Sequence, residues 1–213
     1  MLFLRLDQAL QLERSARSLK ERLVIRYELY NGLSRQEVIQ GRIEHLDPVE
    51  CLLFLLKRHW KHNCMCHIDP ETVRLQIIYS DGRKKGPLIR SDEGGHCSTV
   101  GLHRLVKRVA ERTDIPDKER ISQLVLKRTF AREWLRPHKI GRIKCPRCGY
   151  ELNVDVEVPG GTVGSLQKQL SHKHLWSTAH YLRFVMEDVE HDHDRLMEKV
   201  KDGQEAECLR LVS

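Results

Sequence analysis

The chain has 213 residues, 40% of them hydrophobic, so it is long enough to bury a sizeable core and lacks the composition of a disordered protein. It contains no run of about 20 apolar residues that would span a membrane, and the apolar start is too short for a secretory signal. Its 37 Lys and Arg residues exceed the 30 Asp and Glu residues, and a net charge of +7 favours a polyanionic partner such as nucleic acid. A merely basic soluble protein is the alternative.

The seven cysteines are odd in number and unevenly spaced, which is not the framework of a secreted disulfide-rich domain. We therefore expect a cytoplasmic protein with reduced thiols and no membrane contact. Residues 1–213 are expected to form a single domain, with residues 201–213 as a polar tail.

The first third of the chain has helical periodicity. Leucines recur at roughly helical spacing over residues 6–31, which predicts a helix that stops at Asn31–Gly32. A second helix is expected over Ser34–Gly41. The apolar run within residues 48–60 fits a buried helix or a buried strand, and the pattern does not decide between them. A basic connector rich in His and Cys follows over residues 57–67.

A β-hairpin is expected after this connector. Residues 73–79 read as a strand, residues 80–82 as a turn and residues 87–89 as a short return strand. The tip of this hairpin would carry three cations, Arg83, Lys84 and Lys85. They would either contact a partner or form a solvated turn.

A cationic helix is predicted next. Ser98 or Thr99 is typical of a helix N-cap, and the helix runs to Arg112. The cations Arg104, Lys107 and Arg108 lie largely outside its apolar face. They are expected to contact phosphates, with simple solvation as the alternative. Pro116 opens a further segment that contains residues 121–131.

Residues 138–161 are predicted to form an inserted β-hairpin with a C-x2-C knuckle at its tip. Cys145 and Cys148 have the spacing of two thiolate ligands of a tetrahedral Zn²⁺ ion. No second C-x2-C pair follows, so a structural zinc and a metal-free knuckle are both retained. The remaining ligands would be His138 and His174, or the distant Cys64, Cys66 and His67.

The segment after the knuckle is predicted to contain two helices. Apolar residues at helical spacing predict a helix that ends near His172. Ser177 and Thr178 are suited to cap the next helix, which carries Tyr181 close to its start. A tyrosine hydroxyl is a weak nucleophile near neutral pH and requires neighbouring groups to activate it. On residue types alone, Tyr181 reads as a half-buried aromatic residue.

The same segment resembles the C-terminal signature of the tyrosine recombinases, the phage-integrase family. In that signature L-G-H is followed by a Ser/Thr pair and then by the tyrosine. Here residues 170–172 read L-S-H, residues 177–178 read S-T, and Tyr181 follows. Ser171 replaces the family glycine.

Two earlier segments are similar to other motifs of this family. Residues 30–37, Y-N-G-L-S-R-Q-E, match its G-L-R-x-x-E segment, but the family arginine falls on Ser34 and Arg35 is the next residue. Residues 124–131, L-V-L-K-R-T-F-A, match its H-x-L-R-[HR]-T-F-A box in their second half.

The second box also departs from the family at its charged positions. The box histidine is Leu124 and the box arginine is Lys127, with Arg128 next to it. The resemblance covers roughly residues 6–190, interrupted by the insertion. It implies a mainly α fold with a small antiparallel β-sheet (α+β), and a catalytic-type domain without the N-terminal DNA-clamping domain usual in the family.

The resemblance implies that DNA is cut and rejoined through a 3′-phosphotyrosyl intermediate, without a metal or nucleotide cofactor. Tyr181 would be the nucleophile and His172 a phosphate-binding group. The cations would come from Arg35, Lys127 and Arg128, and the acid from Lys84 or Lys85. The implied partners are double-stranded DNA and further copies of the chain bound to it.

Three readings follow. The first is a site-specific recombinase or integrase, which the spacing of His172 and Tyr181 favours. The second is a catalytically impaired, recombinase-fold accessory or regulatory protein of a mobile element, because Ser34 has no charge and Lys127 lacks the bidentate fork of arginine. The third is a zinc-knuckle DNA-binding regulator. Convergence of the cations, His172 and Tyr181 on one pocket would distinguish them.

Overall fold

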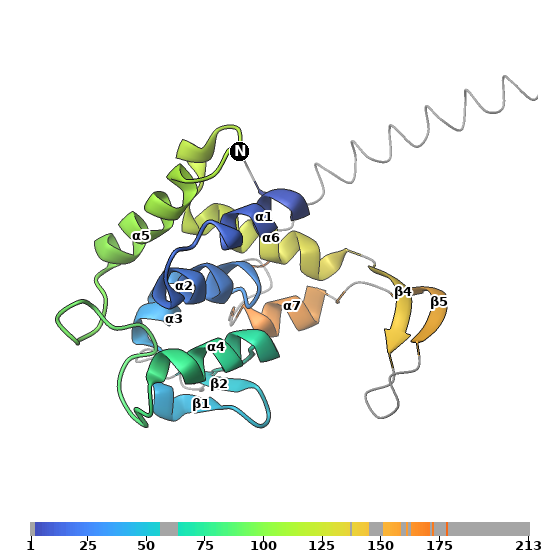
Figure 1. The fold of residues 1–213 in the computed structure, drawn as a ribbon. Coiled ribbons are helices and arrows are strands. Elements are labelled where there is room, and N and C mark those ends of the chain that lie inside the picture. Colours follow the sequence, from blue (N-terminus) through green and yellow to red (C-terminus); the bar gives the residue numbers. More distant parts are fainter. Residues whose placement is uncertain are drawn as a thin grey trace, which may run out of the picture.

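The computed structural model describes residues 3–55, 64–136, 138–144, 151–158, 161, 163–170, 172 and 178. These residues are mainly α-helical, with a small antiparallel sheet and a separate two-stranded hairpin (Figure 1). The predicted fold class, mainly α with a small antiparallel β-sheet, is confirmed. None of the helices in this part of the chain is long and apolar enough to cross a membrane.

The helical run predicted over residues 6–31 is two helices, α1 (Leu6–Arg14) and α2 (Leu19–Leu29). The break occurs because Ser18 is extended and caps α2, its hydroxyl accepting a hydrogen bond from Glu21 N at 3.1 Å. Helix α2 is the centre of the fold, since α1, α4, α5 and α6 all contact it.

The next helix, α3 (Arg35–Gln40), begins where the sequence predicts. Ser34 is its N-cap and forms a capping box with Glu37: Ser34 N donates to Glu37 Oε2 at 2.7 Å, and Ser34 Oγ accepts from Glu37 N at 3.4 Å. A short 3-10 turn, η1 (Ile43–His45), leads from α3 into the sheet.

The sheet is antiparallel in the order β1 (Leu46–Asp47), β2 (Leu52–Leu55) and β3 (Cys64–His67). In β2, Leu53 and Leu55 are buried whereas Phe54 is exposed, the alternation of a strand with one buried face. The apolar run whose structure the pattern left open is therefore a strand. Residues 56–63, which connect β2 to β3, lie outside the described residues.

The strand predicted over residues 73–79 is wrong, because this segment belongs to helix α4 (Pro70–Ser80). Asp69 caps the helix by accepting from Thr72 N at 3.1 Å, Pro70 occupies its first turn, and Asp81 ends it in the left-handed conformation. The return strand is wrong as well: Pro87 forms an isolated bridge with Arg42.

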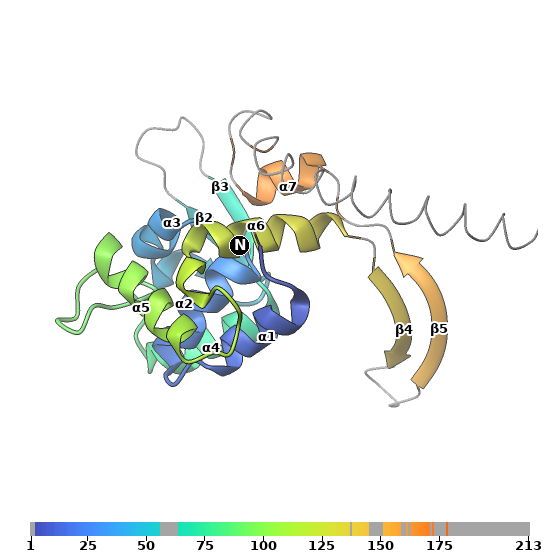
Figure 2. The same ribbon diagram turned by 90° about the horizontal axis from the view of Figure 1, so that it is seen from above.

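The second half of the chain supplies the remaining helices and the hairpin. Helix α5 (Thr99–Glu111) is capped by Ser98 as predicted, and a 3-10 turn η2 (Lys118–Arg120) precedes α6 (Gln123–Leu135). Strands β4 (His138–Lys144) and β5 (Glu151–Val158) pair antiparallel, and they stand away from the helices in both views (Figure 2). Helix α7 (Val163–Gln169) follows.

A small apolar cluster joins α6 to α7, apart from the main core around α2. Phe130, Ala131, Leu166 and Leu170 form it, with Trp134 at its edge. Trp134 also holds the point where the chain returns from the hairpin: Gly161 N donates to Trp134 O at 2.7 Å, and Trp134 Nε1 donates to Ser165 Oγ at 3.1 Å. A Cβ on Gly161 would lie 2.1 Å from Trp134 Nε1, so glycine permits this approach.

Candidate active site

The structure brings together the three segments that carry the recombinase-like motifs. Gly32, in the α2–α3 connection, has φ +68°, and a Cβ there would lie 2.4 Å from Phe130 Cε1 on α6 and 3.1 Å from Leu170 Cδ2 after α7. A glycine is required by both the backbone conformation and the close approach. Residues 30–37, 124–131 and 166–172 therefore meet although more than a hundred residues separate the first from the last.

At the first motif, Ser34 stands in the place of the family arginine and has a structural role. Ser34 caps α3, and its capping box with Glu37 uses both its hydroxyl and its backbone N–H. Arg35, the first residue of α3, is exposed. The cation at this motif is therefore Arg35, one position along the chain from Ser34.

At the second motif, Lys127 is only 7% exposed, whereas Leu124 is 46% exposed. Arg128 is partly buried. Leu124 and Arg128 are four residues apart and so lie on the same face of α6. Lys127 is rotated about 100° from Arg128 around the helix.

Glu28 of α2 is fully buried in the neighbourhood of these cations. Burial raises the pKa of Glu28 well above its ordinary value, and the positive charges of Arg35 and Lys127 oppose that rise. Within the described structure neither carboxyl oxygen of Glu28 has a hydrogen-bond partner. Arg35 and Lys127 thus act on one buried carboxyl, which places these two predicted cations on the same side of the core.

At the third motif, His172 is held by contacts on both sides. Its backbone N donates to Gln167 O at 3.0 Å, and Gln167 Nε2 donates to His172 O at 3.2 Å. Its ring Nδ1 lies 3.0 Å from the hydroxyl oxygen of Thr178, which is fully buried. Thr178, three residues before Tyr181 in the sequence, therefore lies beside the His172 ring, while Tyr181 itself lies outside the described residues.

The assignment of Lys84 and Lys85 as the acid rested on a hairpin that is not present there. These residues and Arg83 lie in the turn after α4, where Arg83 is placed over the Tyr79 ring. The sheet has its hairpin elsewhere, between β2 and β3. Its connection, residues 56–63, reads L-K-R-H-W-K-H-N and carries Lys57 and Lys61. The short apolar run of residues 52–55, followed by a basic connector, was the available signal in the sequence.

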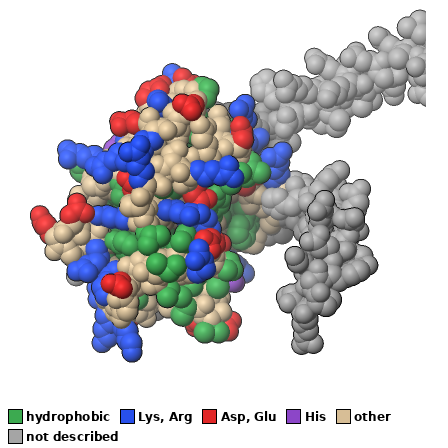
Figure 3. All heavy atoms as spheres, viewed as in Figure 1, with side chains coloured by type: hydrophobic (Ala, Val, Ile, Leu, Met, Phe, Trp, Pro, Cys, Tyr) green, Lys and Arg blue, Asp and Glu red, His purple; other side chains and the backbone are tan. Residues whose placement is uncertain are grey.

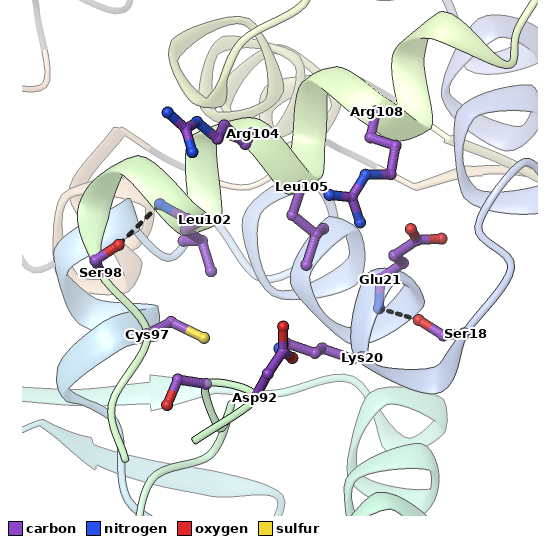
Figure 4. A pocket seen from close by; sticks show the side chains of 12 residues that line it. Ser18, Lys20, Glu21, Asp92, Cys97, Ser98, Leu102, Arg104, Leu105 and Arg108 are labelled. Atoms are coloured by element: carbon purple, nitrogen blue, oxygen red, sulfur yellow. Dashed lines mark hydrogen bonds and ion pairs between the residues drawn. The ribbon is translucent and has the colours of Figure 1, made fainter. Parts of the chain in front are cut away.

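The predicted DNA-binding cations of α5 face two directions. Arg104 and Arg108, one helical turn apart, border a cavity of about 420 Å³ between the N-terminal ends of α2 and α5 (Figure 4). Lys20, also at this cavity, is paired with Asp92 at 2.8 Å. Lys107 Nζ instead donates to the backbone carbonyl of Glu119.

A second hollow adjoins this cavity. Ser91 and Asp92 line both, and the second is also lined by Arg83 and Arg90. In Figure 3, Lys and Arg side chains gather over α5 and again at the turn after α4, with the acidic side chains of the intervening loop between them. Members of both predicted groups, Arg104 and Arg108 of α5 and Arg83 after α4, thus border adjoining hollows.

The metal-site prediction concerns residues that the structure does not describe. Cys145, Cys148 and His174 lie outside the described residues, and of His138 only the backbone is described, at the start of β4 opposite Val158. Among the described side chains no group of three or more His, Cys, Asp or Glu is arranged to hold a metal ion. Of the more distant alternative ligands, Cys66 is buried and donates to Gln169 O at 3.3 Å.

Comparison with known proteins finds similarity in structure alone. No family model and no curated protein sequence matches the chain. Among solved structures, XerA recombinase superposes with a TM-score of 0.70 at 18% identity, over 91% of this chain and 65% of XerA. XerH recombinase bound to a palindromic difH substrate gives a TM-score of 0.63 at 15% identity, over 90% of this chain and 52% of XerH.

The catalytic domain of bacteriophage HP1 integrase has a TM-score of 0.54 at 18% identity, and the match covers 89% of this chain and 92% of that domain. The chain thus spans less than two thirds of XerA and about half of XerH, but nearly all of an isolated catalytic domain. It has the fold of a tyrosine-recombinase catalytic domain.

Proposed function

We propose that the protein is a site-specific DNA recombinase or integrase that cuts and rejoins double-stranded DNA through a 3′-phosphotyrosyl link on Tyr181. The observation that carries the proposal is the convergence at Gly32, where the first motif contacts Phe130 of the second and Leu170 of the third. The protein would act in the cytoplasm, as several copies assembled on the DNA of a mobile element.

In the proposed cleavage step the Tyr181 hydroxyl loses its proton to solvent, its oxygen attacks the phosphorus, and the 5′-oxygen of the next nucleotide leaves. Negative charge accumulates on the phosphate oxygens, and preorganised donors stabilise it. Arg35 and His172 are the proposed donors. If the Thr178 hydroxyl donates to His172 Nδ1, the His172 Nε2 carries the proton and can donate it in a hydrogen bond to the phosphate.

The leaving 5′-oxygen requires a proton. Lys57 and Lys61 of the β2–β3 connection replace Lys84 and Lys85 as the proposed acid, because the resemblance assigns the acid to a hairpin of the sheet. The step conserves the energy of the phosphodiester bond, since the phosphotyrosyl link is reversed by the 5′-hydroxyl of a DNA strand.

A second candidate is a recombinase-fold DNA-binding protein that does not cleave. Two observations favour it. Ser34 contributes a helix cap in place of a cation, and loss of a single oxyanion donor can lower a rate by about 10²–10³. In addition, the buried Glu28 lies near two of the three candidate cations, Arg35 and Lys127.

The experiment that separates the two candidates uses a library of nicked duplexes with random sequence, in which cleavage next to the nick releases a short fragment and traps the adduct. Recombinase activity predicts a covalent protein–DNA species that resists denaturant and is lost in Tyr181→Phe, while DNA binding is retained. Tyr150→Phe, which removes a tyrosine hydroxyl within the inserted segment, is the matched control. An adduct that persists in Tyr181→Phe, or none in the wild-type protein, would overturn the proposal.

A further inference from the structure

Gln169, the last residue of α7, is a buried amide whose hydrogen-bonding groups all have partners. Its Nε2 donates to Asn31 O at 3.0 Å and to His67 O at 2.7 Å, and its Oε1 accepts from His67 N at 3.0 Å. The residue is 7% exposed. Both amide hydrogens and the amide oxygen are therefore used, at a position that the apolar spacing of α7 does not explain.

These bonds join three segments that are distant in sequence. His67 ends β3, Asn31 belongs to the α2–α3 connection, and Gln169 ends α7. The Cys66 thiol adds a link by donating to Gln169 O at 3.3 Å. Figure 2 shows α7 beside both β3 and α6, consistent with the contacts between these elements.

The position of α7 depends on such contacts, because a helix of seven residues has little stability of its own. Leu166 of α7 and Leu170, the residue after it, pack against Phe130 and Ala131 of α6. The polar contact of α7 with the sheet and with the α2–α3 connection is made by Gln169. The apolar face fixes α7 against α6, and the amide fixes its end against the other two segments.

Each of these segments has a role in the proposed function. His172 follows Gln169 by three residues, β3 ends the hairpin whose connection carries Lys57 and Lys61, and the α2–α3 connection leads to Arg35. We propose that Gln169 is a positioning residue, which aligns His172 with this hairpin and with Arg35 and so sets the rate of DNA cleavage without touching DNA. This inference rests on the proposed function.

The chemistry of the site requires an amide. An apolar side chain would leave the buried carbonyl of Asn31 and both backbone groups of His67 without this partner. A glutamate of the same shape would accept from His67 N, but when ionised it would face two carbonyl oxygens. A protonated glutamate would regain one donor.

The test compares Gln169→Met, which keeps the length of the side chain and removes all three bonds, with Gln40→Met, an exposed position on α3. The first readout does not need activity. Hydrogen exchange at the His67 amide should become about tenfold faster in Gln169→Met and stay unchanged in Gln40→Met, and the NMR signals of the His172 ring should shift in the first variant alone.

The second readout is the single-turnover rate of adduct formation with nicked DNA. It should fall by about tenfold or more in Gln169→Met, a loss equivalent to about one net hydrogen bond or more, while the Kd for DNA changes by less than about threefold. Gln169→Glu covers the case in which the methionine variant does not fold, and its rate should rise as the pH falls because the protonated carboxyl donates again.

Unchanged exchange at His67 and an unshifted His172 ring in Gln169→Met would overturn the inference, as would a wild-type rate of adduct formation in that variant. Failure of the proposed function has a different signature, which is the absence of a Tyr181-dependent adduct in the wild-type protein. In that event the exchange and ring measurements still decide whether Gln169 positions His172.

Discussion

At the scale of single residues, Gly32 is where the α2–α3 connection approaches both α6 and α7. Gly32→Ala adds a Cβ in a left-handed conformation and 2.4 Å from Phe130 Cε1. The strain and the overlap together should cost about 2–4 kcal/mol of unfolding free energy, measured by urea denaturation.

Gly82→Ala is the matched control for this prediction. Gly82 has a similar φ of +75°, but a Cβ there meets nothing within 4 Å. The control variant should lose about 1–2 kcal/mol, the cost of the backbone conformation alone. Equal losses at the two positions would show that the contact with α6 and α7 has no energetic consequence.

Glu28 makes the stability of the protein depend on pH. Because burial raises the pKa of Glu28 in the folded state, the folded state binds more protons than the unfolded state above the ordinary carboxyl pKa of about 4.3. Glu28 therefore does not change the unfolding free energy below the ordinary carboxyl pKa. The unfolding free energy declines as the pH rises from that value toward the folded-state pKa of Glu28. Glu28→Gln removes the titration and should flatten the decline.

The measurement is the unfolding free energy between pH 5 and pH 8, where one unit of pKa difference corresponds to about 1.4 kcal/mol. Glu50→Gln, at an exposed position in the turn between β1 and β2, is the control and should retain the wild-type slope. A Glu28→Gln profile parallel to that of the wild type would refute the assignment of the decline to Glu28.

At the scale of elements, the helix starts at Ser34 and Ser98 were predictable from the sequence. Ser34 and Ser98 each mark the start of a helix correctly, because a cap is a local interaction between a side chain and the next turn. The error at α4 has the opposite cause. Its Val, Ile and Tyr residues favour a strand in isolation, whereas Asp69 and Pro70 together begin a helix that packs against α2.

The candidate site was only partly accessible from the sequence. The similarity of residues 124–131 and 170–172 to family motifs singled out Lys127 and His172 as candidates, and the structure brings their segments together. The contribution of Gln169 could not be predicted, because its three hydrogen bonds depend on pairing between segments about 100 or more residues apart. The same applies to Glu28, which the sequence offers as one charged residue among many.

The β4–β5 hairpin carries the prediction about metal. Two strands alone are marginally stable in water, and the connection between them contains Cys145 and Cys148. A zinc ion held by both thiolates would contribute to the stability of the hairpin. A strong chelator should then expose Arg142 and Arg147 to trypsin while the helical body remains folded by circular dichroism.

The control for this prediction is the double variant Cys145→Ser with Cys148→Ser, which should be cleaved with and without chelator. Elemental analysis of the purified protein gives the zinc content directly. Protein without zinc that resists trypsin at these two arginines would show that the hairpin needs no metal.

At the scale of the whole molecule, the net charge of +7 is expected to act through the cations that border the two adjoining hollows. Reversing Arg104 and Arg108 to Glu should weaken DNA binding at low salt and lower the slope of log Kd against log salt by about one unit per phosphate contact removed. Fluorescence anisotropy across a salt series measures both quantities.

The control reverses the charge of Asp92, the ion-pair partner of Lys20. Asp92→Lys adds positive charge at the border of the same two hollows and should strengthen binding. If the slope is the same in all three proteins, the DNA does not contact this face.

The hydrogen bond between Gly161 and Trp134 affects how well the molecule tolerates a change in the length of the segment between these two residues. Because Trp134 O binds Gly161 N, the two ends of the intervening segment meet at the end of α6. The entropy of closing a loop grows only with the logarithm of its length, so segments of very different size cost nearly the same at a point where the ends are already fixed. The junction between α6 and α7 is thus a permissive site, suited to carry a fluorescent reporter or a second binding module in place of the present hairpin.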